Sequence, residues 1–96
     1  GHTADNPHLK ISFAALAADA TLLLTTETRG SVLYVAAGET EISPSEGIVT
    51  AYDNENKTGE PAKEFTMTVP AGSTEINIFN EKHNTKSIYI EAITIK

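Results

Sequence analysis

Apolar residues recur at every second position through most of this chain. In residues 9–13, Leu9, Ile11 and Phe13 alternate with a lysine and a serine, and residues 64–69 alternate in the same way. A period of two places successive side chains on opposite faces of an extended strand. The pattern therefore predicts an all-β chain. We expect seven strands, at residues 9–13, 20–26, 31–36, 47–52, 64–69, 74–79 and 87–95.

The spacing of these strands predicts the architecture. Short strands separated by turn-forming residues are typical of an antiparallel β-sandwich, either immunoglobulin-like or jelly-roll-like. A chain of 96 residues is long enough for one such domain and too short for two ordinary ones. We expect residues 1–6 to be a disordered N-terminal tether and residues 7–96 to be a single β-sandwich domain.

Two local features refine the expected strands. Pro70-Ala71-Gly72 separates two alternating segments, which predicts a β-hairpin between residues 64–69 and 74–79. In residues 87–95 the alternation slips by one position, because Ile88 and Ile90 share one phase whereas Ile93 and Ile95 share the other. Such a slip indicates a β-bulge near Glu91-Ala92.

The expected core is aliphatic, because the chain has no tryptophan and only six aromatic residues. The run Leu22-Leu23-Leu24 predicts a strand buried on both faces or nearly so. The alanine-rich residues 13–20 favour a helical turn by propensity, but two turns are too short for a stable isolated helix. The core residues that we expect are Phe13, Leu22, Leu24, Leu33, Val35, Val49, Phe65, Met67, Val69, Ile76, Ile78, Ile88 and Ile90.

Composition excludes several classes of function. The absence of cysteine removes disulfides, thiolate zinc sites and a cysteine nucleophile. The net charge is −6, and Arg29 is the only arginine. Nucleic-acid binding needs a basic surface, and anionic membranes repel an acidic chain, so we expect neither partner and no direct membrane insertion.

The sequence contains no recognisable catalytic motif. No serine lies in a G-x-S-x-G motif, no H-E-x-x-H pair is present, and two of the three histidines, His2 and His8, lie near the N-terminus. We therefore expect that the protein is not an enzyme and that no residue is catalytic.

The polar residues from Asp53 to Glu60 offer hard oxygen ligands of the kind that calcium prefers. Gly59 and Glu60 stand at the wrong offsets for a helix–loop–helix calcium loop. The segment has two interpretations, a calcium site or a solvated turn between strands, and the spacing favours the turn. We expect no metal and no cofactor.

Carbohydrate binding is the ligand chemistry that the sequence supports best. Sugars are bound by aromatic rings together with amides, carboxylates and arginine, usually on loops held by a rigid scaffold. Tyr34, Tyr52 and Tyr89 supply aromatic rings, and two polar loops supply amides and charged groups. Each tyrosine lies within an expected strand, where a packed tyrosine with its hydroxyl at the surface is more common. Arg29 has two interpretations, a ligand-binding clamp or a structural salt bridge, of which the second is the more common. The candidate ligand-binding residues are Arg29, Tyr52, Asp53, Asn54, Asn80, His83, Asn84 and Tyr89.

Two segments carry a family resemblance. KEFTMTVPAGSTEINIF at residues 63–79 and SIYIEAITI at residues 87–95, with its Tyr89-Ile90-Glu91, resemble the C-terminal half of small carbohydrate-binding-like β-sandwich modules. These modules occur beside pectate-lyase-like and other glycan-processing domains in bacterial exported and surface proteins. Residues 39–60 depart from the pattern, since they lack its aromatic and glycine-rich middle region. The resemblance implies an extracellular, cell-surface or periplasmic location and attachment to neighbouring domains of a larger protein.

Two functions are therefore expected. The first is a non-catalytic carbohydrate-binding accessory module of a bacterial secreted or cell-surface protein, with an oligo- or polysaccharide as its partner. The alternative is an immunoglobulin-like spacer or protein-interaction domain with no small-molecule ligand. An exposed tyrosine beside polar side chains favours the first, and packed tyrosines favour the second.

Overall fold

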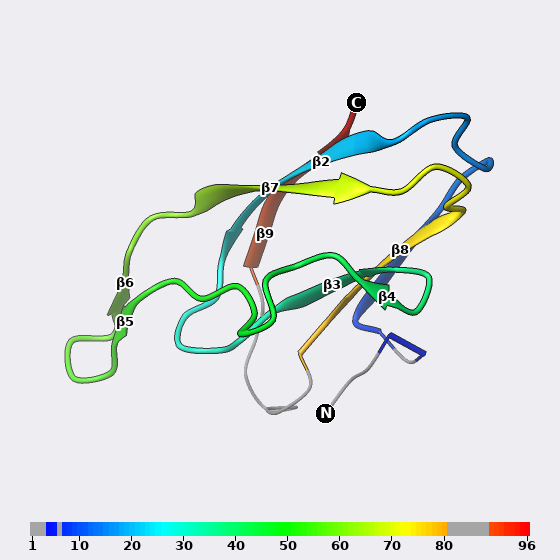
Figure 1. Cartoon of the computed structure of the whole chain (residues 1–96). Helices are drawn as coiled ribbons and strands as arrows, with labels where there is room; N and C mark the ends of the chain where they lie inside the picture. The colour runs from blue at the N-terminus through cyan, green and yellow to red at the C-terminus, as the bar shows by residue number, and fades with distance from the viewer. Residues whose placement is uncertain (1–3, 6, 81–88) are drawn as a thin grey trace.

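Two antiparallel sheets packed face to face form the molecule in the computed structural model, which describes residues 4–5, 7–80 and 89–96 (Figure 1). The four-stranded sheet has the order β1-β8-β3-β4, and the three-stranded sheet has the order β7-β2-β9. A small hairpin of β5 and β6 projects at one end. The nine strands within the described residues are β1 (Leu9–Ser12), β2 (Ala20–Glu27), β3 (Tyr34–Ala37), β4 (Thr40–Glu41), β5 (Tyr52–Asp53), β6 (Thr58–Gly59), β7 (Lys63–Val69), β8 (Glu75–Phe79) and β9 (Tyr89–Ile95).

The all-β sandwich predicted from the sequence is confirmed, and its longer strands alternate between the sheets. Strands β1, β3 and β8 lie in one sheet, and β2, β7 and β9 lie in the other. In an immunoglobulin domain the last two strands are neighbours in one sheet. Here β8 pairs with β1 and β3, whereas β9 pairs with β2. The connectivity of the sandwich therefore differs from that of an immunoglobulin domain.

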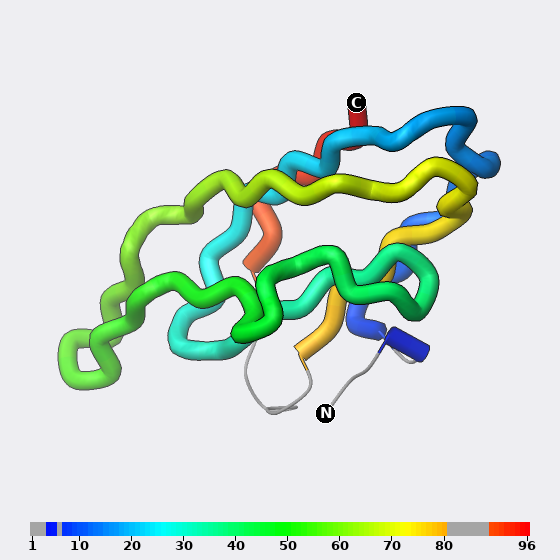
Figure 2. Tube along the Cα trace, viewed as in Figure 1, coloured from blue at the N-terminus to red at the C-terminus, as the bar shows by residue number. Residues whose placement is uncertain are grey.

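The predicted hairpin between residues 64–69 and 74–79 is wrong. Strands β7 and β8 belong to different sheets, so the turn at Pro70-Ala71-Gly72 carries the chain from one sheet to the other. The connection from β1 to β2 crosses in the same place and bonds to this turn. Gly72 N donates to Leu16 O at 2.8 Å, and Phe13 N donates to Thr74 O at 2.9 Å. The two crossing connections lie side by side at the same end of the sandwich (Figure 2).

The same crossing explains why residues 13–20 form no helix. Alanine favours a helix, but this segment spans only about two turns and its backbone bonds are made to the neighbouring connection. In the part of the chain that the structure describes, no helix is long and apolar enough to span a membrane.

The core between the sheets is aliphatic, as expected. Leu22 and Leu24 of β2 are fully buried and meet Ile76 and Ile78 of β8 in one apolar cluster. Leu23 lies on the outer face and is partly buried, so β2 is fully buried on its inner face and partly buried on its outer face. Phe13, Phe65 and Ile90 are partly buried against the core. Ile88 and the start of the expected last strand lie outside the described residues.

The outer face of the larger sheet is covered as well. Tyr34 and Phe79 stack there with ring centroids 5.6 Å apart, and Ala4 packs against the cluster that they form with Ala36. Tyr34 is therefore a packed tyrosine that is only 8% exposed.

The segment that links β4 to β5 departs most from the sequence prediction. The expected strand at residues 47–52 is reduced to a bridge between Ile48 and Leu33 and to the start of β5. Gly47 has φ +85°, a left-handed backbone conformation. After it, the side chains alternate between core and surface in the phase opposite to the expected one. Ile48 is consequently buried, and Val49, an expected core residue, is 53% exposed.

The predicted bulge in the last strand is confirmed. Thr25 pairs with Ala92 and the next residue, Thr26, pairs with Ile90, so Glu91 is the additional residue. The extra residue lets Ile90 and Ile93 both turn toward the core although they are three positions apart. Glu91 itself remains exposed at the surface.

Candidate functional site

A tight turn after β2 presents the single arginine at the surface. Ser31 N donates to Thr28 O at 2.9 Å, and the two central residues, Arg29 and Gly30, have φ values of +46° and +79°. Two consecutive positive φ values define a type I′ turn, in which glycine, asparagine or aspartate is the usual residue. Arg29 therefore occupies a conformation that is unfavourable for its residue type.

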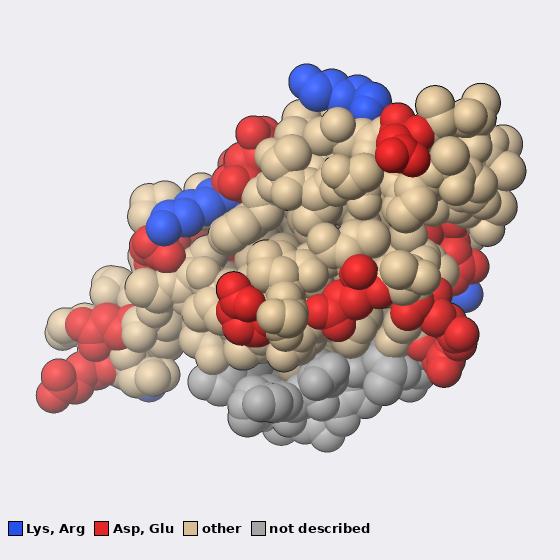
Figure 3. All heavy atoms as spheres, viewed as in Figure 1, with Lys and Arg blue, Asp and Glu red and all other residues tan. Residues whose placement is uncertain are grey.

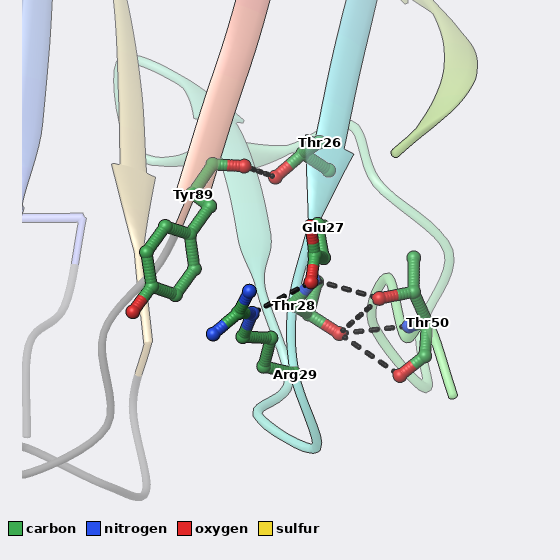
Figure 4. A network of polar contacts seen from close by, with 6 residues as sticks. All are labelled: Thr26, Glu27, Thr28, Arg29, Thr50 and Tyr89. Carbon is green, nitrogen blue, oxygen red and sulfur yellow. Dashed lines mark hydrogen bonds and ion pairs between the residues drawn. The ribbon is translucent and has the colours of Figure 1, made fainter. Parts of the chain in front are cut away.

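Two buried polar contacts hold this turn in place. Thr28 N donates to Thr50 Oγ1 at 2.7 Å, and Thr50 N donates to Thr28 Oγ1 at 2.7 Å (Figure 4). On the other side of the turn, Asn80 Nδ2 donates to Ser31 Oγ. Because all four residues are buried, these bonds fix the direction in which Arg29 leaves the turn.

Replacement of Thr28 by valine tests this clamp. The variant keeps the shape of the side chain and leaves the buried N–H of Thr50 without its acceptor. We expect the free energy of unfolding to fall by about 1–3 kcal/mol, measured by urea denaturation. Thr66→Val on the exposed face of β7 is the matched control and should change stability by less than about 0.5 kcal/mol. Equal effects of the two variants would contradict the clamp.

Arg29 lies between a carboxylate and an aromatic ring. Its Nε donates to Glu27 Oε1 at 2.6 Å, and its guanidinium carbon lies 4.5 Å from the centroid of the Tyr89 ring (Figure 4). The hydrogen bond to Glu27 raises the pKa of Arg29 above its ordinary value, and the same carboxylate adds a favourable charge interaction. The salt bridge expected for Arg29 is therefore present, and it fixes the side chain on Tyr89.

Tyr89 is held by the edge of the smaller sheet and is nevertheless exposed. The backbone carbonyl oxygen of Tyr89 accepts a hydrogen bond of 2.8 Å from Thr26 Oγ1. In the sheet, Tyr89 of β9 pairs with Glu27 of β2. The side chain is 46% exposed, although Arg29 contacts its ring. Beside the ring is a shallow depression of about 210 Å³, lined by Glu27, Ala62, Tyr89, Ile90 and Glu91.

Tyr52 completes the cluster from the β5–β6 hairpin. It is half-buried, and it lies close enough to Arg29 to raise the pKa of the guanidinium. Gly59, which pairs with Tyr52, provides the room. A Cβ atom there would lie 2.8 Å from Glu27 Oε1 and 3.3 Å from Tyr52 Cδ1. A side chain at position 59 would therefore push Glu27 and Tyr52 apart.

The structure thus brings together three of the residues predicted from the sequence, namely Arg29, Tyr52 and Tyr89. Asn80 is fully buried, so it supports the Arg29 turn from within instead of facing a ligand at the surface. His83 and Asn84 lie outside the described residues.

Asp53 is the last residue of β5, and Asn54 follows it in the turn of the β5–β6 hairpin. Both oxygens of Asp53 are used within it: Oδ1 accepts from Glu55 N at 2.9 Å, and Oδ2 accepts from Asn56 Nδ2 at 2.7 Å. The bonds from Asn56 lower the pKa of Asp53 below its ordinary value. The segment has the geometry of a turn capped by its own aspartate. Among the described residues, no three histidine, aspartate or glutamate side chains gather in a way that could hold a metal ion.

Sequence reasoning did not identify Glu27, Gly59 and Glu91 as members of the site. Glu27 had a weak signal, because it precedes Arg29 by two residues at the end of a strand, next to an Arg-Gly turn. Gly59 and Glu91 had none, since their roles arise from pairing with strands distant in sequence.

Comparisons with known proteins add no assignment to this geometry. No family model matches the chain, and neither the curated proteins nor the solved structures yield a match.

Proposed function

We propose that the protein is a non-catalytic carbohydrate-binding module whose site is the cluster of Tyr89, Arg29 and Glu27. The observation that carries the proposal is an exposed tyrosine ring next to an arginine and a carboxylate that are held in fixed positions. The apolar face of a pyranose can rest on the ring, and its hydroxyl groups can bond to the charged side chains. Such a small set of oriented polar groups beside an apolar surface is how ligand sites obtain specificity.

The hydrogen-bonding groups match a sugar diol. Among the described residues, Arg29 donates a side-chain hydrogen bond through Nε, and its Nη groups can donate to the hydroxyl oxygens of a sugar. Glu27 bonds to Arg29 through Oε1, so Oε2 can accept from a hydroxyl group, and Glu91 adds a second carboxylate at the border of the depression. The depression is smaller than a typical drug-sized pocket, which suits a single ring of an oligosaccharide.

An NMR titration of the isotope-labelled protein tests this proposal. The ligands are neutral hexose oligosaccharides at millimolar concentration, because a shallow site of this size is expected to bind weakly. Amide shifts should be confined to Glu27, Arg29, Tyr89, Ile90 and Glu91. Absence of shifts with every sugar would overturn the proposal and favour a spacer or protein-interaction domain.

Substitution of the ring provides the second test. Tyr89→Ala should weaken binding by about tenfold, which corresponds to about 1.4 kcal/mol. Arg29→Asn should also weaken binding, and it should not destabilise the fold, because asparagine tolerates the positive φ of the turn. Lys57→Asn is the matched control, since Lys57 has φ +58° in the distant turn of the β5–β6 hairpin. Unchanged binding by Tyr89→Ala would exclude this site.

A further inference from the structure

The single arginine does not make the candidate site positively charged, because a carboxylate offsets its charge. Arg29 Nε and Glu27 Oε1 are 2.6 Å apart, so the arginine is already paired with a carboxylate of its own sheet. The Tyr89 ring also contacts the guanidinium, with its centroid 4.5 Å from the guanidinium carbon. An acidic ligand that approaches the Nη groups of Arg29 therefore meets a cation whose charge Glu27 already offsets.

The surroundings of the site are acidic. Of the residues that line the depression, Glu27 and Glu91 are charged and both are carboxylates. Lys63, the residue after the lining residue Ala62, is paired with Glu60 at 3.0 Å. Over the face of the molecule that Figure 3 shows, acidic side chains cover more of the surface than basic ones, in agreement with the net charge of −6. With Arg29 included, the two glutamates give the site a net charge of −1.

On the basis of the proposed function, we infer that this site accepts neutral or amino hexoses and rejects uronic acids. The carboxylate of a uronic acid would lie near Glu27 and Glu91, and no lysine or arginine is among the described residues that line the depression. Two unit charges about 6 Å apart in water interact by an energy that corresponds to roughly a threefold change in affinity. Arg29 offsets one of the two carboxylates, so the net charge of −1 disfavours a uronic acid by about threefold.

The test compares ligands that differ only at one carbon. Each neutral hexose oligosaccharide that binds is titrated beside its C6-oxidised form and its 2-amino-2-deoxy form, at low ionic strength, where charge interactions are weakly screened. We expect the oxidised form to bind about threefold more weakly and the amino form to bind at least as well as the neutral sugar. Equal or tighter binding of the oxidised form would overturn the inference and leave the proposed function intact.

A charge variant separates repulsion from a poor steric fit. Glu91→Gln removes one carboxylate of the depression without touching the pair of Arg29 and Glu27. The preference for neutral over oxidised sugar should fall by about threefold. Glu41→Gln on β4, in the other sheet, is the control and should leave the preference unchanged. An unchanged preference in Glu91→Gln would show that shape and not charge rejects the acid, and binding of no sugar at all would overturn both proposals.

Discussion

Leu24→Ala is expected to lower the free energy of unfolding by about 2–5 kcal/mol. Leu24 is fully buried in the middle of β2, where it pairs with Phe65 on one side and Ile93 on the other. Its removal loses the transfer energy of the buried atoms and leaves a cavity that two flanking strands prevent from closing. A domain of this size has a total stability of only about 5–15 kcal/mol, so the loss is a large fraction of the whole.

Leu23→Ala is the matched control for this prediction. Leu23 is the preceding residue of the same strand, but it lies on the outer face and is partly exposed. The same substitution there should cost clearly less, because part of the side chain remains in water in the folded state. Urea and thermal unfolding of the two variants measure the difference. Equal losses would mean that both faces of β2 are buried, contrary to the structure.

Gly47→Ala is expected to destabilise the protein by about 2–5 kcal/mol through two separate effects. The backbone has φ +85°, a conformation that costs an L-residue about 1–2 kcal/mol. The added methyl group would also lie 2.3 Å from Val32 Cγ1 and 3.1 Å from the Tyr34 ring, so packed side chains would have to move. Overpacking of this kind lowers the free energy of unfolding by about a further 1–3 kcal/mol.

Gly72→Ala separates the two effects. Gly72 has nearly the same φ, +86°, but a Cβ atom there would have no neighbour within 4 Å. We expect the control to lose only the backbone contribution of about 1–2 kcal/mol. Thermal unfolding should therefore show a clearly larger fall in Tm for Gly47→Ala. Equal falls would indicate that the side chains around Gly47 adjust without cost.

The candidate site could be predicted only in part. Arg29, Tyr52 and Tyr89 were expected as ligand-binding residues from their chemistry, but nothing in the sequence placed them together. Their proximity depends on β9 pairing with β2 and on the β5–β6 hairpin reaching back to the end of β2. Asn80 had suitable chemistry for a surface contact, yet the end of β8 places it inside the molecule, against Ser31.

The alternation of apolar and polar residues by itself determined the all-β class, the phase of most strands, the aliphatic core and the bulge at Glu91. Each of these features depends only on which face a side chain occupies along one strand. Only the tertiary structure decided that β7 and β8 lie in different sheets and that Ile48 replaces Val49 in the core. A Pro-Ala-Gly turn can reverse a chain within one sheet or carry it across to another. Its local chemistry is the same in both, and the neighbouring connection at Leu16, which bonds to Gly72, distinguishes them.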